Sequence, residues 1–144
     1  MRRETILENL KSRLRTITAA NGYTWEPKLF EWLTTPLSAA DLPALILKDG
    51  DDEIRHDEPS GSSEHSLSVE ILLFDGQNGT TASSLRRKLA DVMGVVGKEE
   101  ADGEDLGDYR SVEATRMEID QSETLLGAAR LELLFRYRTK IWEM

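Results

Sequence analysis

The chain has 144 residues, of which 39% are hydrophobic and 31% are charged, and its formal net charge is −9 at pH 7. This balance fits one globular domain over residues 1–144, and the absence of cysteine excludes disulfides, thiolate metal sites and a cysteine nucleophile. No apolar run approaches the roughly 20 residues that span a bilayer, and an acidic chain lacks the basic footprint of a general nucleic-acid binder.

The first third of the chain predicts one helix and two strands. Apolar residues recur at helical spacing over residues 4–19, and Asn21-Gly22 then favours a helix end, because both residues tolerate a left-handed backbone. Aromatic residues predict a strand over residues 28–33. The continuous apolar run over residues 42–47 is typical of a strand that is buried on both faces.

The middle of the chain predicts a loop, a strand and a second helix. Residues 49–64 are polar and acidic and contain Pro59, so we expect a loop there. Apolar and polar residues alternate over residues 65–74, as they do in a half-buried strand. An apolar stripe at helical spacing predicts a helix over residues 81–96, and Thr81 is suited to cap its first N–H groups.

The last third predicts another acidic loop followed by two strands. The loop is expected over residues 98–110, and the first strand over residues 112–120. Residues 121–124 are the expected hairpin connection. The second strand, over residues 129–138, has one apolar face and one mostly charged face, as expected for a sheet covered on one side only.

The predicted order of elements is α-β-β-β-α-β-β. We therefore expect an α+β fold with a mainly antiparallel sheet of about five strands and two helices on one face of it.

The negative charge is concentrated in the two predicted loops. Residues 49–64 hold seven acidic side chains against one arginine, and residues 98–110 hold six against one lysine and one arginine. The rest of the chain is therefore close to neutral, and we expect the two acidic loops to be flexible and solvated.

The densest carboxylate cluster, over residues 49–53, is the main candidate for a metal site. Such a cluster can bind Ca²⁺ or Mg²⁺, but a calcium loop also needs a glycine at its sixth position and a glutamate at its twelfth. The segment matches this pattern only at its first residues. We interpret it as a solvated loop and expect no metal.

The two histidines, His56 and His65, flank the polar loop and have no cysteine nearby in the sequence. We expect both at the surface. The serines of this loop do not lie in a Gly-x-Ser-x-Gly elbow, and no phosphate-binding glycine loop is present. The sequence therefore predicts no catalytic residue and no cofactor.

Two basic groups stand out in this acidic chain, one on the predicted helix over residues 81–96 and one on the final strand. They fit either solvated faces or an interface in which the basic surface of one copy meets acidic residues of a neighbouring copy. The candidate interface residues are Arg86, Arg87, Arg130, Arg136, Asp49, Asp51 and Asp52.

Six segments form a pattern that covers nearly the whole chain: residues 3–7, 21–23, 42–53, 65–74, 85–96 and 135–139. They resemble, in order and in a chain of similar length, segments of one family of viral proteins. On these segments the chain resembles the tail terminator proteins (minor tail or tail-completion proteins) of long-tailed bacteriophages and prophages.

The resemblance implies a structural role without enzymatic activity. Members of that family form a ring, typically a hexamer, that caps the tail tube, stops its polymerisation and presents a surface for joining the head. The implied partners are further copies of the chain, the tail tube protein and a head-completion or neck protein, with no membrane and no specific nucleic acid. The isolated chain can be a monomer, because a ring interface can be too weak alone.

The implied location is the cytoplasm of the bacterial host during assembly, and then the virion tail where the phage is functional. Two alternatives stay open. One is a head–tail connector or neck protein, and the other is a metal-binding enzyme domain that uses the acidic cluster at residues 49–53.

Overall fold

Helices and strands follow one another in the order predicted from the sequence, α-β-β-β-α-β-β. The computed structural model describes residues 1–33, 35–76, 81–120 and 126–144. The main elements are α1 (Arg2–Leu14), β1 (Lys28–Glu31), β2 (Ala44–Asp57), β3 (Ser62–Asp75), α2 (Ala82–Gly97), β4 (Tyr109–Asp120) and β5 (Leu126–Lys140). Two short 3₁₀ helices, η1 (Ala19–Asn21) and η2 (Ala39–Asp41), lie in the connections.

The five strands form a single sheet in the order β1-β2-β3-β5-β4. The pairs β2–β3, β3–β5 and β4–β5 are antiparallel, whereas β1 pairs with β2 in parallel. The predicted α+β class and mainly antiparallel sheet are confirmed, and the parallel pair at one edge makes the sheet mixed.

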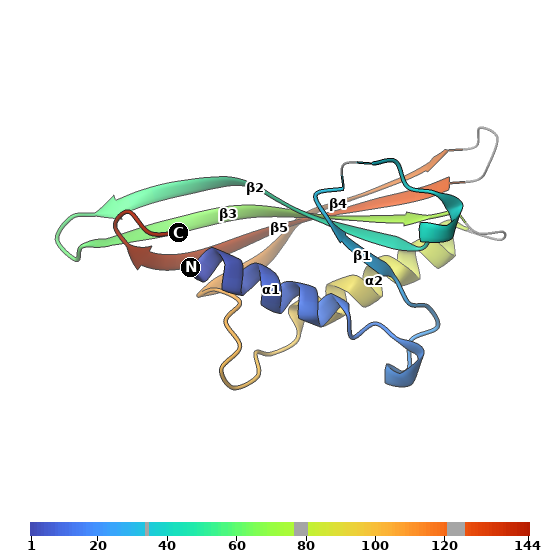
Figure 1. Ribbon diagram of the computed structural model, residues 1–144, viewed down its shortest axis with the longest axis horizontal. Helices are drawn as coiled ribbons and strands as arrows, with labels where there is room; N and C mark the ends of the chain where they lie inside the picture. Colours follow the sequence, from blue (N-terminus) through green and yellow to red (C-terminus); the bar gives the residue numbers. More distant parts are fainter. Residues whose placement is uncertain (34, 77–80, 121–125) are drawn as a thin grey trace.

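Both α-helices cover the same face of the sheet (Figure 1). Ile6, Leu10 and Leu14 recur along one side of α1 and are completely buried, as an amphipathic helix requires. The second helix begins where the sequence predicts, because the Thr81 hydroxyl accepts a hydrogen bond from the backbone N–H of Ser84 at 3.0 Å.

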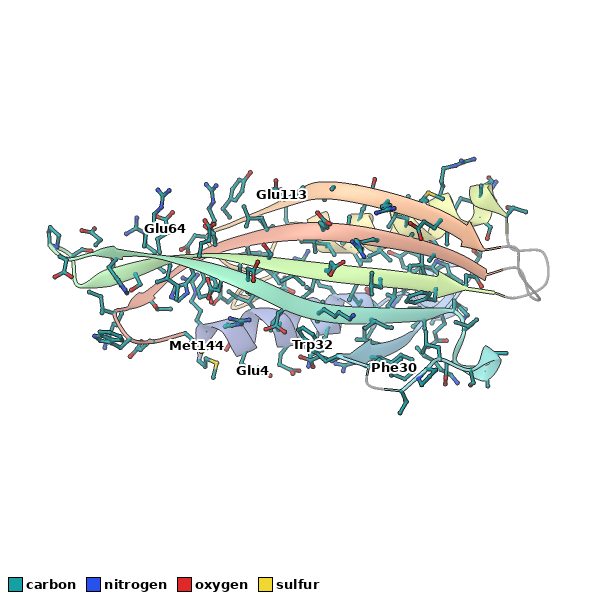
Figure 2. The ribbon with its side chains drawn as sticks, turned by 90° about the horizontal axis from the view of Figure 1, so that it is seen from above. Glu4, Phe30, Trp32, Glu64, Glu113 and Met144 are labelled. Carbon is teal, nitrogen blue, oxygen red and sulfur yellow. The ribbon has the colours of Figure 1, made fainter. Side chains whose placement is uncertain are left out.

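The other face of the sheet is covered by neither α-helix, and we call it the open face (Figure 2). Strict alternation along β3 and β5 separates the two faces, because successive side chains of a strand point to opposite sides. Buried side chains such as Leu67, Ile71, Leu131 and Phe135 point to the helices, while the residues between them point to the open face.

The prediction of a loop over residues 49–64 is wrong. Residues 49–57 continue β2 and residues 62–64 begin β3, so only residues 58–61 turn the chain. Gly61 permits this turn with a φ of +68°. The charges mislead because β1 pairs with β2 only up to Leu47, and a strand edge beyond that point accommodates acidic side chains.

Other boundaries differ by a few residues. The predicted first helix is too long, because α1 ends at Leu14 and the β-branched residues that follow favour extended backbone. Ile17 lies beyond the end of α1 but is completely buried. Its expected place in the core is therefore correct, although it does not belong to the helix. The predicted hairpin connection over residues 121–124 lies outside the described residues.

The ends of β2, β3 and β5 run past the start of α1 (Figure 1). We call this projection, residues 52–66 and 135–140, the arm. The chain then turns back along it, and the carbonyl of Met144 accepts a hydrogen bond from the backbone N–H of Arg2 at 2.9 Å. Neither described helix is long and apolar enough to cross a membrane.

Candidate assembly surface

The open face mixes exposed charges with half-buried apolar side chains. Cross-strand pairing places Lys48, Glu70 and Glu132 in one row, and Ile46, Leu72 and Arg130 in the next. Figure 2 looks onto this face, with Glu64 in the arm and Glu113 along the β4 edge. A non-obligate interface has much the same mixture of polar and apolar surface as the rest of a protein, so this composition alone does not distinguish an interface.

The basic residues of the open face are held by neighbours in their own chain. Arg130 forms an ion pair with Glu70 at 2.7 Å, and about half of its side chain is exposed. The Arg136 guanidinium lies over the Tyr109 ring, 5.3 Å from its centroid. Exposed pairs of this kind contribute little to folding, about 0–1 kcal/mol, so these side chains are free to exchange partners at low cost.

Arg86 and Arg87 lie on the opposite side of the molecule. Both are exposed on α2, whose buried side packs against the other face of the sheet. The four arginines predicted as interface residues therefore divide into two pairs, one on each side of the domain. A single flat contact cannot include all four.

An apolar cavity of about 480 Å³ lies at the end of the open face away from the arm. Ile46, Leu72 and Phe74 form its floor, and residues 33, 35–39 and 42 form its wall. Lys48 lies at its boundary with its ammonium over the Trp32 ring, 5.9 Å from the centroid. The volume falls in the range of small-molecule and side-chain pockets.

The acidic cluster does not form the solvated patch expected from the sequence. Gly50 and Asp51 together oppose one residue of β3, which makes a β-bulge between Asp49 and Asp52. The bulge resets the alternation, so that Asp49 and Asp52 both turn toward the helix side. Asp51 stays exposed.

Asp49 is held by two donors. It accepts hydrogen bonds from Arg3 at 2.5 and 3.0 Å and from the Trp32 indole N–H at 2.7 Å. Burial raises the pKa of the Asp49 carboxyl, but the hydrogen bonds from Trp32 and Arg3 outweigh it and leave the pKa below its ordinary value. Asp49 is therefore a partly buried ion-pair partner within the fold, and its carboxylate is already engaged by two donors of its own chain.

Asp52 organises a buried polar group that we call the arm cluster, made of Arg3, Asp52, His65, Tyr137 and Thr139. His65 Nδ1 lies 2.9 Å from Asp52 Oδ2, and His65 Nε2 lies 2.8 Å from the Thr139 hydroxyl. The Tyr137 hydroxyl donates to Asp52 at 3.2 Å, and its ring stacks on His65 with centroids 4.5 Å apart. Arg3 approaches Asp52 to 3.6 Å.

Two sequence predictions fail at this cluster. His65 is completely buried rather than at the surface, whereas His56 is exposed as predicted. Asp52 has a side chain that is only 8% exposed, so it cannot meet a neighbouring copy. Burial and the adjacent Asp52 charge also raise the pKa of Tyr137, which keeps its hydroxyl protonated as a donor.

The line Asp52–His65–Thr139 has the spacing of a nucleophile relay, but its hydrogen bonds indicate a structural role. The Thr139 hydroxyl can donate to the carbonyls of Lys140 at 3.0 Å and Glu143 at 3.2 Å. When the Thr139 hydroxyl donates its proton to these carbonyls, it can only accept a hydrogen bond from His65. A nucleophilic hydroxyl would instead have to donate its proton to the histidine. The cluster thus fastens β2, β3 and β5 to the returning chain.

The second acidic segment, over residues 98–110, is tied to α1. Glu104 pairs with Arg13 at 2.7 Å, and Arg2 pairs with Asp105 and Asp108, each at 2.8 Å. The hydrogen bond from Arg13 lowers the pKa of Glu104, and that from Arg2 lowers the pKa of Asp105. These acids are satisfied within the chain, and Tyr109 and Arg110 already belong to β4.

Arg13 also closes the end of α2. Its guanidinium donates to the carbonyls of Val95, Val96 and Lys98 at 2.9, 3.1 and 2.6 Å. The last carbonyls of a helix lack partners within it, and a cation there also meets the negative end of the helix dipole. Spacing along α1 gives no hint of this role.

A metal site over residues 49–53 finds no support in the described residues, none of which form a group of three or more suitable ligands. Comparison with models of known protein families found no match. A search of curated proteins also found none.

Proposed function

We propose that the protein is a structural subunit of phage tail assembly that caps the tail tube, ends its polymerisation and provides the surface that joins the head. The observation that carries this proposal is the open face, a long sheet surface that neither α-helix covers. Its half-buried apolar side chains and loosely paired charges suit contact with another protein. The resemblance described above supplies the class of partner.

The division of the basic residues supports a front-to-back arrangement. Arg130 and Arg136 lie on the open face, while Arg86 and Arg87 lie on the outer side of α2. Contacts that use two different surfaces of one chain produce a ring when the rotation closes. We propose that each pair of arginines faces either an adjoining subunit or the tube.

Fewer acidic residues are available for such contacts than the sequence predicts. Asp49 pairs with Arg3, and Asp52 pairs with His65. The acidic residues at 104, 105 and 108 pair with Arg13 and Arg2. Asp51 and Glu53 remain exposed along β2. Asp51 is therefore the one acidic candidate from residues 49–52 that we retain for an interface.

Incubation with purified tail tubes tests the proposal, with capped ends and tube length scored by electron microscopy. The tubes are assembled from a purified phage tail tube protein. We expect the wild-type chain to cap ends and limit tube length, and the paired variants Arg130→Glu/Arg136→Glu and Arg86→Glu/Arg87→Glu to lose capping. Glu58→Gln, in the exposed turn of the arm, serves as the control surface change.

Two results would count against the proposal. If the wild-type chain leaves tube ends bare but binds tailless capsids, the protein is a head–tail connector. If all four charge reversals leave capping intact, the basic residues are ordinary solvated side chains and the assigned surfaces are wrong.

A further inference from the structure

Trp142 is the most exposed large apolar side chain described, and it follows the arm. Its side chain is 92% exposed, and its backbone has a φ of +73°. This left-handed conformation is unfavourable for a bulky residue. Strain combined with exposure of a large aromatic surface is typical of a residue kept for contact with a partner.

The position of Trp142 defines which way it faces. Its ring lies 6.1 Å from that of His56, and His56 pairs with the buried Ser63 on the helix side of β2 and β3. Ile54, 48% exposed, is on the same side. Trp142 therefore forms an apolar knob on the helix side of the arm.

The apolar cavity lies at the other end of the sheet, and its floor residues Ile46, Leu72 and Phe74 belong to the open face. Figure 1 shows the segment over residues 35–42 beside that end of the sheet. A second copy displaced along the sheet would thus lay the helix side of its arm over the cavity of the first. Knob and cavity are different surfaces of one chain, so each copy can give a knob to one neighbour and take one from another.

Charge next to the knob complements charge next to the cavity. Glu143 follows Trp142 and is exposed, and Lys48 borders the cavity. Within the described part of the chain, no ion pair involves either Glu143 or Lys48. Complementary charges of this kind fix the register of an interface.

We propose that Trp142 of one copy inserts into the cavity of a second copy, between residues 35–42 and the sheet, where Glu143 meets Lys48. The proposal rests on the self-assembly in the proposed function and names its contact. A tryptophan buries about 150–250 Å², well below the roughly 800 Å² per partner of a stable interface. The contact is therefore weak in free solution and strengthens where a tube gathers several copies.

Disulfide trapping tests the contact, because the chain has no cysteine of its own. Lys48→Cys and Glu143→Cys are made in separate chains of different length, mixed at high concentration and oxidised, with and without tail tubes. The control pairs Glu143→Cys with Asp102→Cys, which is exposed between α2 and β4 and belongs to no assigned contact surface. We expect the yield of the Lys48→Cys/Glu143→Cys heterodimer to exceed that of the control pair by about tenfold. This corresponds to an association constant about ten times higher for the proposed contact than for a random encounter.

A second substitution separates the knob from the cysteine positions. Trp142→Ala in the Glu143→Cys chain should lower the trapped heterodimer by about thirtyfold, the loss typical of an interface tryptophan, and Trp142→Phe should retain part of it. Because the side chain is 92% exposed, folding should be unchanged by circular dichroism.

Heterodimer yields equal to the control, both with and without tail tubes, would overturn the contact. Yields that Trp142→Ala leaves unchanged would also overturn it. Either result would also be seen if a tube protein, and not a second copy, filled the cavity. Failure of this contact is separable from failure of the proposed function. Capped tubes without specific trapping leave tube capping standing, and specific trapping without tube binding leaves only the contact between copies.

Discussion

The arm cluster and the open face both bring acidic and basic side chains together on strands, with opposite physical consequences. Around Asp52 the groups are largely buried and form hydrogen bonds with one another, and His65 is completely buried. Around Arg130 the ion pair with Glu70 is about half exposed. Burial makes the first group costly to disturb and exposure makes the second inexpensive to rearrange. The same residue types therefore hold the fold in one place and suit assembly in the other.

Asp52→Ala should give the largest loss of stability. It leaves His65, the Tyr137 hydroxyl and Arg3 without their shared acceptor, and breaking a buried charged pair costs about 3–5 kcal/mol. Urea denaturation measures this loss. The adjacent Asp51→Ala, at an exposed position of the bulge, should stay within about 0.5 kcal/mol of wild type. Equal effects from the two variants would remove the distinction between buried and exposed carboxylates.

Arg13→Met should come next. Methionine keeps the aliphatic bulk but loses the bonds to Glu104 and to the carbonyls at the end of α2, which should cost about 2–3 kcal/mol. Arg15→Met on the exposed side of the same chain segment is the matched control. Thermal unfolding that is equally affected by both would show that Arg13 does not close α2.

Acid should weaken the ion pairs that anchor α1. The pKa values of Asp49, Glu104 and Asp105 are lowered in the folded state, so the unfolded chain takes up protons first as the pH falls. Their contribution is complete above about pH 5 and is lost as the pH drops through and below the ordinary values of 3.8 and 4.5. Asp105→Asn should flatten this dependence in denaturation at several pH values. An unchanged slope would indicate that Asp105 is not paired with Arg2 in solution.

Arg130→Ala should have the smallest effect on folding, about 0.2–1 kcal/mol by urea denaturation, because its pair with Glu70 is solvent-screened. Under the proposed function the same change should reduce capping of tail tubes. Glu70→Ala removes the other half of the pair and provides the control for loss of the ion pair alone. A large loss of stability from either variant would show that the ion pair on the open face stabilises the fold, which would contradict its assignment to assembly.

Most of the architecture could be predicted from periodicity. The alternation over residues 129–138 gives both the strand β5 and the face it buries, and the apolar stripe ending near Val96 gives α2. The acidic residues could not be placed in this way, because a bulge at Gly50 shifts the alternation by one residue and no local pattern announces it. His65 does fall on the buried side of the alternation in β3, and that signal favours a buried histidine over a surface one.

The roles of several charged residues were harder to predict because they depend on distant segments. Sequence cannot reveal that Arg13 meets the end of α2 or that Arg3 meets Asp49 across the fold. Trp142 had no signal beyond its size, and only its exposure and its left-handed backbone distinguish it. Charge density pointed to Asp49 and Asp52, whereas in the structure Asp49 pairs with Arg3 and the side chain of Asp52 is largely buried.

Hydroxyl-radical footprinting of Tyr109 in the presence and absence of tail tubes tests most directly whether the open face is the contact surface. Tyr109 is 52% exposed and lies against Arg136 at the edge of this face. Labelling of Tyr109 should fall when tubes are added, while labelling of the buried Phe135 stays low throughout. Unchanged labelling of Tyr109 on tubes that are visibly capped would show that another surface makes the contact.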